Sequence, residues 1–227
     1  MTLSAYVDRI YEQFARYPFP GSVSVCEQCG PEWTVAAITA TPLRSLSLPQ
    51  LCAIHVMTLD DDGLRHFFPR LMEVMLHTPW PVFDFRLADL EMRFPQWQPD
   101  ERAAVRALSE QVWRQMLDEY PCELGYFSGC PSALDLLTWC GLDLVAHLES
   151  LTTTEVQAAA QHLADLVDAV FTLRDPFESA SKTTVLDWIS GPTIGARLQS
   201  AFFSADSDEA ARQLSAAHEL WTVCASR

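Results

Sequence analysis

Hydrophobic residues along this chain recur mostly at the three- and four-residue spacing of an α-helix. Tyr6, Ile10 and Phe14 form one such stripe, and Leu163 and Leu166 belong to another. Alternation of β-branched with polar residues, which is typical of strands, is nearly absent, and only 8 of the 227 residues are glycine. The pattern therefore predicts an all-α protein.

The helical stretches are separated by short loops in which proline is frequent. We expect roughly ten helices in stacked antiparallel pairs, with a curved, solenoid-like array as the natural arrangement. Residues 1–227 should form one helical domain, with a sub-boundary near 120–131, where Pro, Gly and Cys cluster. The helical segments are expected at 1–14, 31–40, 47–58, 64–77, 84–94, from 99 onward, 131–139, 142–148, after 155, and at 182–190, 194–203 and 206–224.

Several of these segments carry helix-start signals. In a capping box, a Ser, Thr or Asp side chain caps the helix and a Glu or Gln three residues later bonds back to it. Pro69 is expected to begin the regular part of its helix, because proline suits the first helical turn. The candidate capping boxes are Ser47 with Gln50, Thr152 with Glu155, and Asp206 with Glu209.

The composition is strongly acidic, with a formal net charge of −15 and a pI of about 4.6. Binding to nucleic acid requires Lys and Arg to neutralise phosphates, and anionic membrane surfaces attract basic segments in the same way. We therefore expect neither nucleic acid nor a membrane as a partner.

The acidic residues are most one-sided between Arg114 and Arg174, where nine carboxylates occur and no Lys or Arg. Such a stretch cannot form helical Glu–Lys pairs, each of which stabilises a helix by about 0.2–0.5 kcal/mol. A basic protein partner is the simplest functional explanation, and the alternative is a solvated acidic face that keeps the protein in solution. We expect partner contacts from Asp118, Glu119, Glu123, Asp135, Asp143, Glu149, Asp165 and Asp168.

The cysteine content and the N-terminus indicate a cytoplasmic protein. Residues 1–14 are amphipathic and lack the unbroken apolar core of a signal peptide, and no run is long enough to span a bilayer. Seven cysteines without an export signal fit reduced thiols, and the odd number fits a disulfide framework poorly.

One set of residues has the ligand types of a zinc site. Cys26-x-x-Cys29 and Cys52-x-x-His55 together supply four candidate ligands for a tetrahedral zinc ion. However, Cys52 and His55 also suit an ordinary apolar helix face, and a lone C-x-x-C is a weak signal. We favour thiols that bind no metal, and expect no cofactor.

No catalytic motif is present. The sequence lacks H-E-x-x-H, G-x-S-x-G, a P-loop and G-x-G-x-x-G, and His147-Leu148-Glu149 lacks the downstream P-C-x-x-C of a zinc deaminase. We therefore expect a non-enzymatic acidic binding protein. The alternatives are a helical adaptor or scaffold that binds a peptide or partner protein, and an enzyme whose site has no recognisable motif.

The first half of the chain resembles a known family. The matching stretches are Cys26-x-x-Cys29, Pro42-Leu43-Arg44-Ser45-Leu46-Ser47, and Leu64-Arg65-His66-Phe67-Phe68-Pro69-Arg70-Leu71-Met72-Glu73. They resemble an uncharacterised family of bacterial helical proteins with a C-x-x-C, an L-R-x-L-S and an F-R-H-F-L-P-R-L-L-E-like stretch. Some members resemble immunity proteins found beside secreted antibacterial toxins. With the acidic segment, the resemblance implies an immunity protein whose partner is the basic, nucleic-acid-directed domain of a cognate toxin.

The arginines of this motif have a simpler expected role. Arg44, Arg65 and Arg70 lie near acidic residues at 60–62 and at Glu73. We expect structural ion pairs from them rather than a site for an anion.

Overall fold

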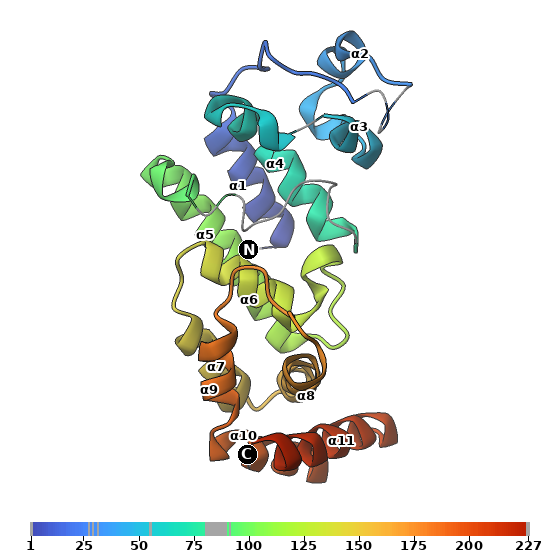
Figure 1. The fold of residues 1–227 in the computed structure, drawn as a ribbon, viewed down its shortest axis with the longest axis vertical. Helices are drawn as coiled ribbons and strands as arrows, with labels where there is room; N and C mark the ends of the chain where they lie inside the picture. The colour runs from blue at the N-terminus through green and yellow to red at the C-terminus, as the bar shows by residue number, and fades with distance from the viewer. Residues whose placement is uncertain are drawn as a thin grey trace. The chain divides into compact units, whose positions relative to one another are not determined.

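The computed structural model describes residues 2–26, 28, 30, 32–54, 56–79, 90 and 92–225. Across these residues the chain forms eleven α-helices and no strand, which confirms the predicted all-α class (Figure 1). The helices are α1 (Leu3–Phe14), α2 (Val35–Ala40), α3 (Leu48–Ala53), α4 (Asp61–His77), α5 (Pro99–Asp118), α6 (Cys130–Trp139), α7 (Leu144–Thr153), α8 (Gln157–Thr172), α9 (Lys182–Ile189), α10 (Pro192–Phe203) and α11 (Asp208–Cys224). The expected helix at 84–94 falls largely outside the described residues.

The helix starts confirm one of the three capping boxes. Ser47 and Gln50 cap α3 reciprocally, as expected. The box at 152–155 is wrong, because α7 extends to Thr153 and α8 begins only after Val156, without a side-chain cap. The cap of α11 is shifted by one residue: Ser207, not Asp206, accepts the bond from the Ala210 amide.

The expectation for Pro69 is also wrong. Asp60 caps α4 by accepting a hydrogen bond from the Gly63 amide at 2.8 Å, so the helix begins at Asp61 and Pro69 lies inside it. A good cap and a first turn with two acids favour this earlier start, because acids suit the positive end of a helix.

The chain divides into two compact units. Unit 1 comprises residues 1–108 and 124–126, and unit 2 comprises 109–123 and 127–227. The division therefore falls within α5 and again around Leu124–Tyr126. The predictions of a single domain and of a curved helical array concern both units together and stay predictions.

Unit 1 is built on the pairing of α1 with α4. Aromatic rings fill the space between them: Phe14 lies 5.3 Å from Phe68, and Phe68 lies 4.7 Å from Trp97, between ring centroids. Gly125 adopts a φ of +58°, and any side chain there would collide with the Met75 carbonyl. The aromatic cluster therefore packs on the middle of α4, and Gly125 lies against its C-terminal end.

Unit 2 is organised around α8, which contacts α6, α7, α9, α10 and α11. Leu163, Leu166 and Val167 are fully buried, as the helical spacing predicted. Beside α8, α10 packs tightly on α11, because Gly195 leaves no room for a side chain against the ring of Trp221. None of the described helices has the length and hydrophobicity needed to cross a bilayer.

Candidate functional site

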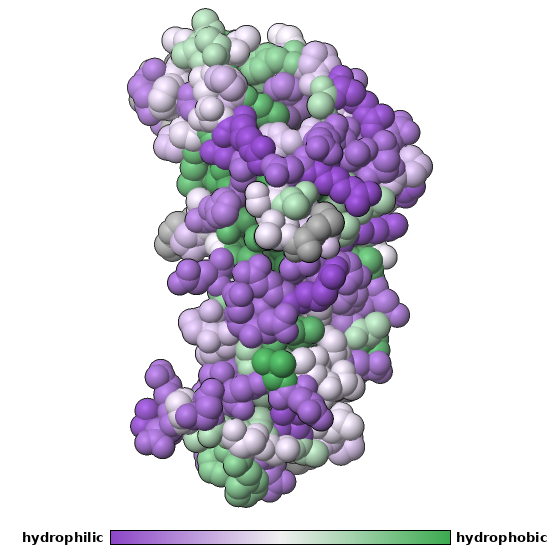
Figure 2. Space-filling model, turned by 180° about the vertical axis from the view of Figure 1, so that it is seen from behind, coloured by the Kyte–Doolittle hydropathy of each residue, from purple (hydrophilic) through white to green (hydrophobic). Residues whose placement is uncertain are grey.

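Seven of the eight predicted partner-binding residues have exposed side chains, and Asp135 is buried. All eight lie in unit 2. In the part of the chain that the structure describes, none of them forms an ion pair with Lys or Arg. Hydrophilic residues cover much of the face seen in Figure 2. The exposed seven are Asp118, Glu119, Glu123, Asp143, Glu149, Asp165 and Asp168.

Asp135 has a structural role. Its side chain on α6 is only 3 % exposed and accepts hydrogen bonds from the amides of Glu178, Ser179 and Ala180 at 2.7–2.9 Å. Burial raises the pKa of Asp135, and the three amides offset only part of that rise. The carboxylate fixes the loop before α9 onto α6, so it is not part of the exposed acidic surface.

Asp143 also supports the fold. It is the N-cap of α7 and accepts hydrogen bonds from the amides of Val145 and Ala146 at 3.0 and 3.2 Å. One carboxylate oxygen is therefore used locally, although the residue remains exposed.

Asp165 and Asp168 line a groove between α8 and α11. A cavity of about 220 Å³ is bounded by these two carboxylates and by small or apolar residues of both helices. A second cavity of about 610 Å³ shares Gln213 with it and reaches the start of α11, where Asp206 and Glu209 lie. We call the two together the α8–α11 groove. Its lining is Tyr120, Pro121, Gln161, Ala164, Asp165, Asp168, Asp206, Ser207, Glu209, Ala210, Gln213, Ala216, Ala217 and Leu220.

A polar network crosses the groove at Gln213. Its amide nitrogen donates to the Tyr120 hydroxyl and to Oδ1 of Asp165, both at 2.7 Å. Its amide oxygen accepts a hydrogen bond from Gln161 at 3.2 Å. Burial raises the pKa of Tyr120, and the negative charge of Asp165 raises it further, so the phenol stays protonated.

His162 lies directly behind Tyr120. It is only 2 % exposed, and its ring centroid is 4.8 Å from that of Tyr120. Nε2 lies 2.9 Å from the Glu119 carbonyl, which can only accept, so Nε2 carries the proton. Burial lowers the pKa of His162, which favours the neutral ring. Nδ1 is then a buried acceptor with no partner among the described residues.

Sequence reasoning found two of the four carboxylates in the groove. It assigned Asp206 and Glu209 only to a capping box, and it missed Tyr120, Gln161 and Gln213. Acidic residues at 206, 208 and 209 were the available signal, but their neighbours on α8 are too far away in sequence to be paired with them.

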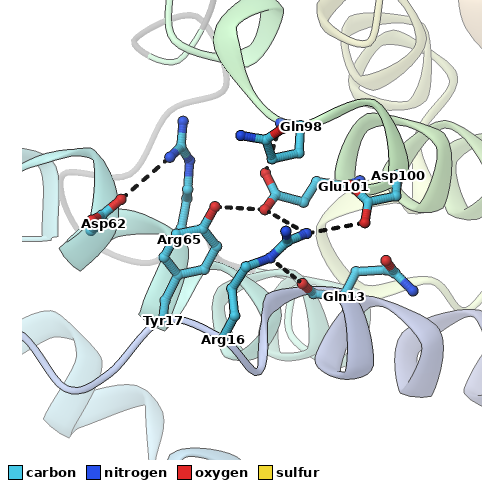
Figure 3. A network of polar contacts seen from close by, with 8 residues as sticks. All are labelled: Gln13, Arg16, Tyr17, Asp62, Arg65, Gln98, Asp100 and Glu101. Carbon is cyan, nitrogen blue, oxygen red and sulfur yellow. Dashed lines mark hydrogen bonds and ion pairs between the residues drawn. The ribbon is translucent and has the colours of Figure 1, made fainter.

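Several carboxylates of unit 1 are paired with arginine, in contrast to those of the groove. Figure 3 shows Glu101, whose side chain is fully buried, accepting hydrogen bonds from the Tyr17 hydroxyl at 2.6 Å and the Gln98 amide at 3.0 Å. Arg16 lies 3.2 Å from the same carboxylate. The network joins the end of α1 to the start of α5 and leaves little capacity for a ligand.

The arginines of the family-like motif form structural ion pairs, as predicted. Arg65 lies 3.3 Å from Asp62, and Arg70 lies 2.5 Å from Glu73, which Arg44 also approaches at 3.4 Å. Burial alone would raise the pKa of Glu73, but the bonds from Tyr11 and Arg70 and the nearby positive charges hold that pKa below its usual value.

The two halves of the candidate zinc set are only partly described. The backbone brings their segments together, because the Cys26 amide donates to the Ala53 carbonyl at 2.8 Å. Cys29 and His55 lie outside the described residues, and no group of three metal-ligand side chains occurs among the others. The absence of zinc stays a prediction, which elemental analysis of the purified protein and of a Cys26→Ser variant can test.

No family model, no curated protein and no solved structure matches this chain.

Proposed function

We propose that this chain is a non-enzymatic cytoplasmic binding protein whose unit 2 covers a basic partner protein. The observation that supports the proposal is the set of exposed carboxylates with no Lys or Arg partner, four of them around the α8–α11 groove. Arg212 is the one Lys or Arg of α11, and it does not line the groove.

The positions of these carboxylates support a role in binding, because several reduce the stability of the free protein. Asp118 and Glu119 lie at the C-terminal end of α5, where the helix is already negative and no basic residue occupies the last turn. Asp165 and Asp168 are three residues apart on α8, so their charges repel. Placements of this kind cost about 0.2–1 kcal/mol each, which a bound basic partner would offset.

The partner that best fits this surface is the basic domain of a cognate, nucleic-acid-directed toxin, with the chain as its immunity protein. A domain that acts on DNA or RNA needs a cationic face to hold phosphates. An acidic inhibitor can cover that face and associate quickly, because complementary charge steers the encounter. The family resemblance of the first half agrees with this role.

The test begins with the gene next to the one that encodes this chain. We expect it to encode a secreted protein with a small basic C-terminal domain. Production of that domain in bacterial cells should stop growth, and coproduction of this chain should restore it. A basic neighbour that this chain neither binds nor neutralises would refute the immunity function.

Charge reversal tests which surface is used. The variant Glu149→Lys, Asp165→Lys, Asp168→Lys should slow association with the basic domain and flatten its dependence on salt. A matched control reverses three exposed carboxylates outside the surface, Glu12, Glu32 and Asp187, with the same change in net charge. Equal effects of the two variants, with helical content intact, would show that only net charge matters.

A hydrophobic patch favours a second candidate function, that of a helical adaptor. Phe203 is 77 % exposed at the end of α10, and the exposed Phe202 lies beside it, with ring centroids 5.2 Å apart. Figure 2 shows hydrophobic surface at the end of unit 2 that α10 and α11 form. Binding of a partner to this patch would depend little on salt. Phe203→Ser would weaken that binding, whereas the triple charge reversal would not.

A further inference from the structure

A hollow of about 190 Å³ lies between α10 and α11 and shares no residue with the α8–α11 groove. Phe202 and Phe203 line it on α10, and Ser215 and His218 line it on α11. Phe203 nevertheless remains 77 % exposed beside the hollow. A projecting aromatic ring next to a hollow on the same face is a shape that can fit a second copy of itself.

The charge around this hollow differs from the charge of the groove. The hollow has no acidic residue in its lining, whereas each of the two groove cavities has two. The whole of α10 contains no Asp or Glu, although the chain has 30 of them. A basic partner would therefore find no carboxylate to bind in the hollow. Two copies of a chain with a net charge of −15 would repel each other less here than across the groove, because like charges brought together across an interface cost free energy.

Two opposite charges on α11 give the surface beside the hollow a self-complementary pattern. Arg212 and Glu219 are exposed and seven residues apart, so they lie on one side of the helix, separated by two turns or about 10 Å. That separation is too long for an ion pair within the helix, and neither side chain forms an ion pair elsewhere in the described part of the chain. Ser215, at the edge of the hollow, lies between them along the helix.

We infer that this surface, formed by Phe202, Phe203, Arg212, Ser215 and Glu219, binds a second copy of the chain in a symmetric dimer. We call it the α10–α11 face. When two α11 helices pack antiparallel about a two-fold axis near Ser215, each Arg212 meets the Glu219 of the other copy, because residue i contacts j and j contacts i in such an interface. The exposed rings then pack near the axis. The contact uses another side of α11 than the groove, so it does not depend on the proposed function.

The size of the aromatic contact indicates a weak dimer. Phe202 is 38 % exposed and Phe203 is 77 % exposed. Because a whole aromatic side chain buries about 150–250 Å², the rings of both copies would together bury roughly 350–600 Å². Stable interfaces bury about 1,200–2,000 Å² in total, so the exposed side of α11 must supply the remainder. We therefore expect a dissociation constant in the micromolar range.

Sedimentation velocity on the intact chain tests for the dimer. At about 150 mM salt, which screens much of the net charge, the mass should rise from 25.5 kDa toward twice that value as the concentration increases from about 1 to 300 µM. A mass of 25.5 kDa at every concentration would overturn the inference. This holds also if the monomer captures a different protein through Phe203, which is the result that an adaptor would give.

A change of one ring tests whether the dimer uses this face. Phe203→Ser should raise the dissociation constant of the dimer about tenfold or more, because each copy loses its most exposed ring and buried aromatic residues dominate interfaces. Leu173→Ser is the matched control, since it replaces a 55 % exposed apolar residue outside the face and should leave the dimer unchanged. Circular dichroism checks that both variants keep their helical content. A dimer that is unaffected by Phe203→Ser would overturn the inference.

A charge swap tests the two-fold arrangement. Arg212→Glu and Glu219→Arg should each weaken the dimer, because each puts like charges opposite one another in two places. The double variant Arg212→Glu, Glu219→Arg should return to within about threefold of the parent dissociation constant, because both ion pairs form again with reversed sign. Arg174→Glu, at a 97 % exposed side chain outside the face, controls for net charge and should have little effect. A double variant that dimerises no better than the single variants would overturn the inference.

Discussion

At the residue scale, carboxylates in this chain have two distinct environments. Asp135 and Glu101 are buried, and each is satisfied by several donors. Asp165 and Asp168 are exposed at the groove and lack cationic partners in the described part of the chain. Replacement by alanine should therefore change the free energy of unfolding differently for buried and for exposed carboxylates.

Asp135→Ala should lower the free energy of unfolding by about 3 kcal/mol, because three backbone amides lose their acceptor. Urea denaturation at constant pH measures the change. Glu32→Ala, at an exposed position outside the helices, is the control and should stay within about 0.5 kcal/mol of the parent. A parent-like midpoint for Asp135→Ala would show that the 178–180 loop does not depend on this carboxylate.

His162 should make stability depend on pH. Its folded pKa lies below the ordinary value of 6.5, so the unfolded chain binds the proton more readily. Its contribution to stability is therefore complete above about pH 6.5 and decreases as the pH falls from there toward the folded pKa. His162→Gln keeps a donor for the Glu119 carbonyl and removes the titration. The difference in unfolding free energy between parent and variant should change across this range, and a constant difference would contradict the assignment.

At the scale of elements, α8 combines buried leucines on one side with repelling carboxylates on the other. The same two carboxylates serve the proposed binding. Stability and binding should therefore respond in opposite directions to a change of charge on this helix.

Asp168→Lys should raise the free energy of unfolding by about 0.5–1 kcal/mol. It replaces a repelling pair with an attracting one three residues from Asp165 and places a cation toward the C-terminal end of α8. The same variant should slow association with the proposed basic partner. Urea denaturation and association kinetics on one preparation measure the two effects. A variant that loses stability and affinity together would point to damaged packing instead.

A structural feature could be predicted from the sequence where the interacting residues lie close together along the chain. The capping box of Ser47 with Gln50 spans three residues and was predicted correctly. The bond from Gln213 to Asp165 spans 48 residues and the bond from the Glu178 amide to Asp135 spans 43, so neither leaves a local pattern. The burial of His162 likewise depends on the Glu119 carbonyl of another element. Helices and acidic segments are local properties, whereas the groove results from tertiary packing.

At the scale of the whole molecule, a net charge of −15 means self-repulsion, which salt screens. Added sodium chloride, from about 20 to 500 mM, should raise the Tm of the free chain while it weakens binding to a basic partner. The triple reversal at Glu149, Asp165 and Asp168 should reduce both responses, and thermal melts across a salt series test the first. A Tm that does not change with salt would show that the charges are too far apart to destabilise the chain.

The cation-poor surface of unit 2 also determines what accompanies the free protein in solution. Carboxylates that have no Lys or Arg beside them attract an excess of small cations from the solvent. A partner's arginines would displace these ions, and their return to bulk solution is a gain in entropy. Complex formation should then give off little heat, because the ions released, more than the contacts made, favour the bound state.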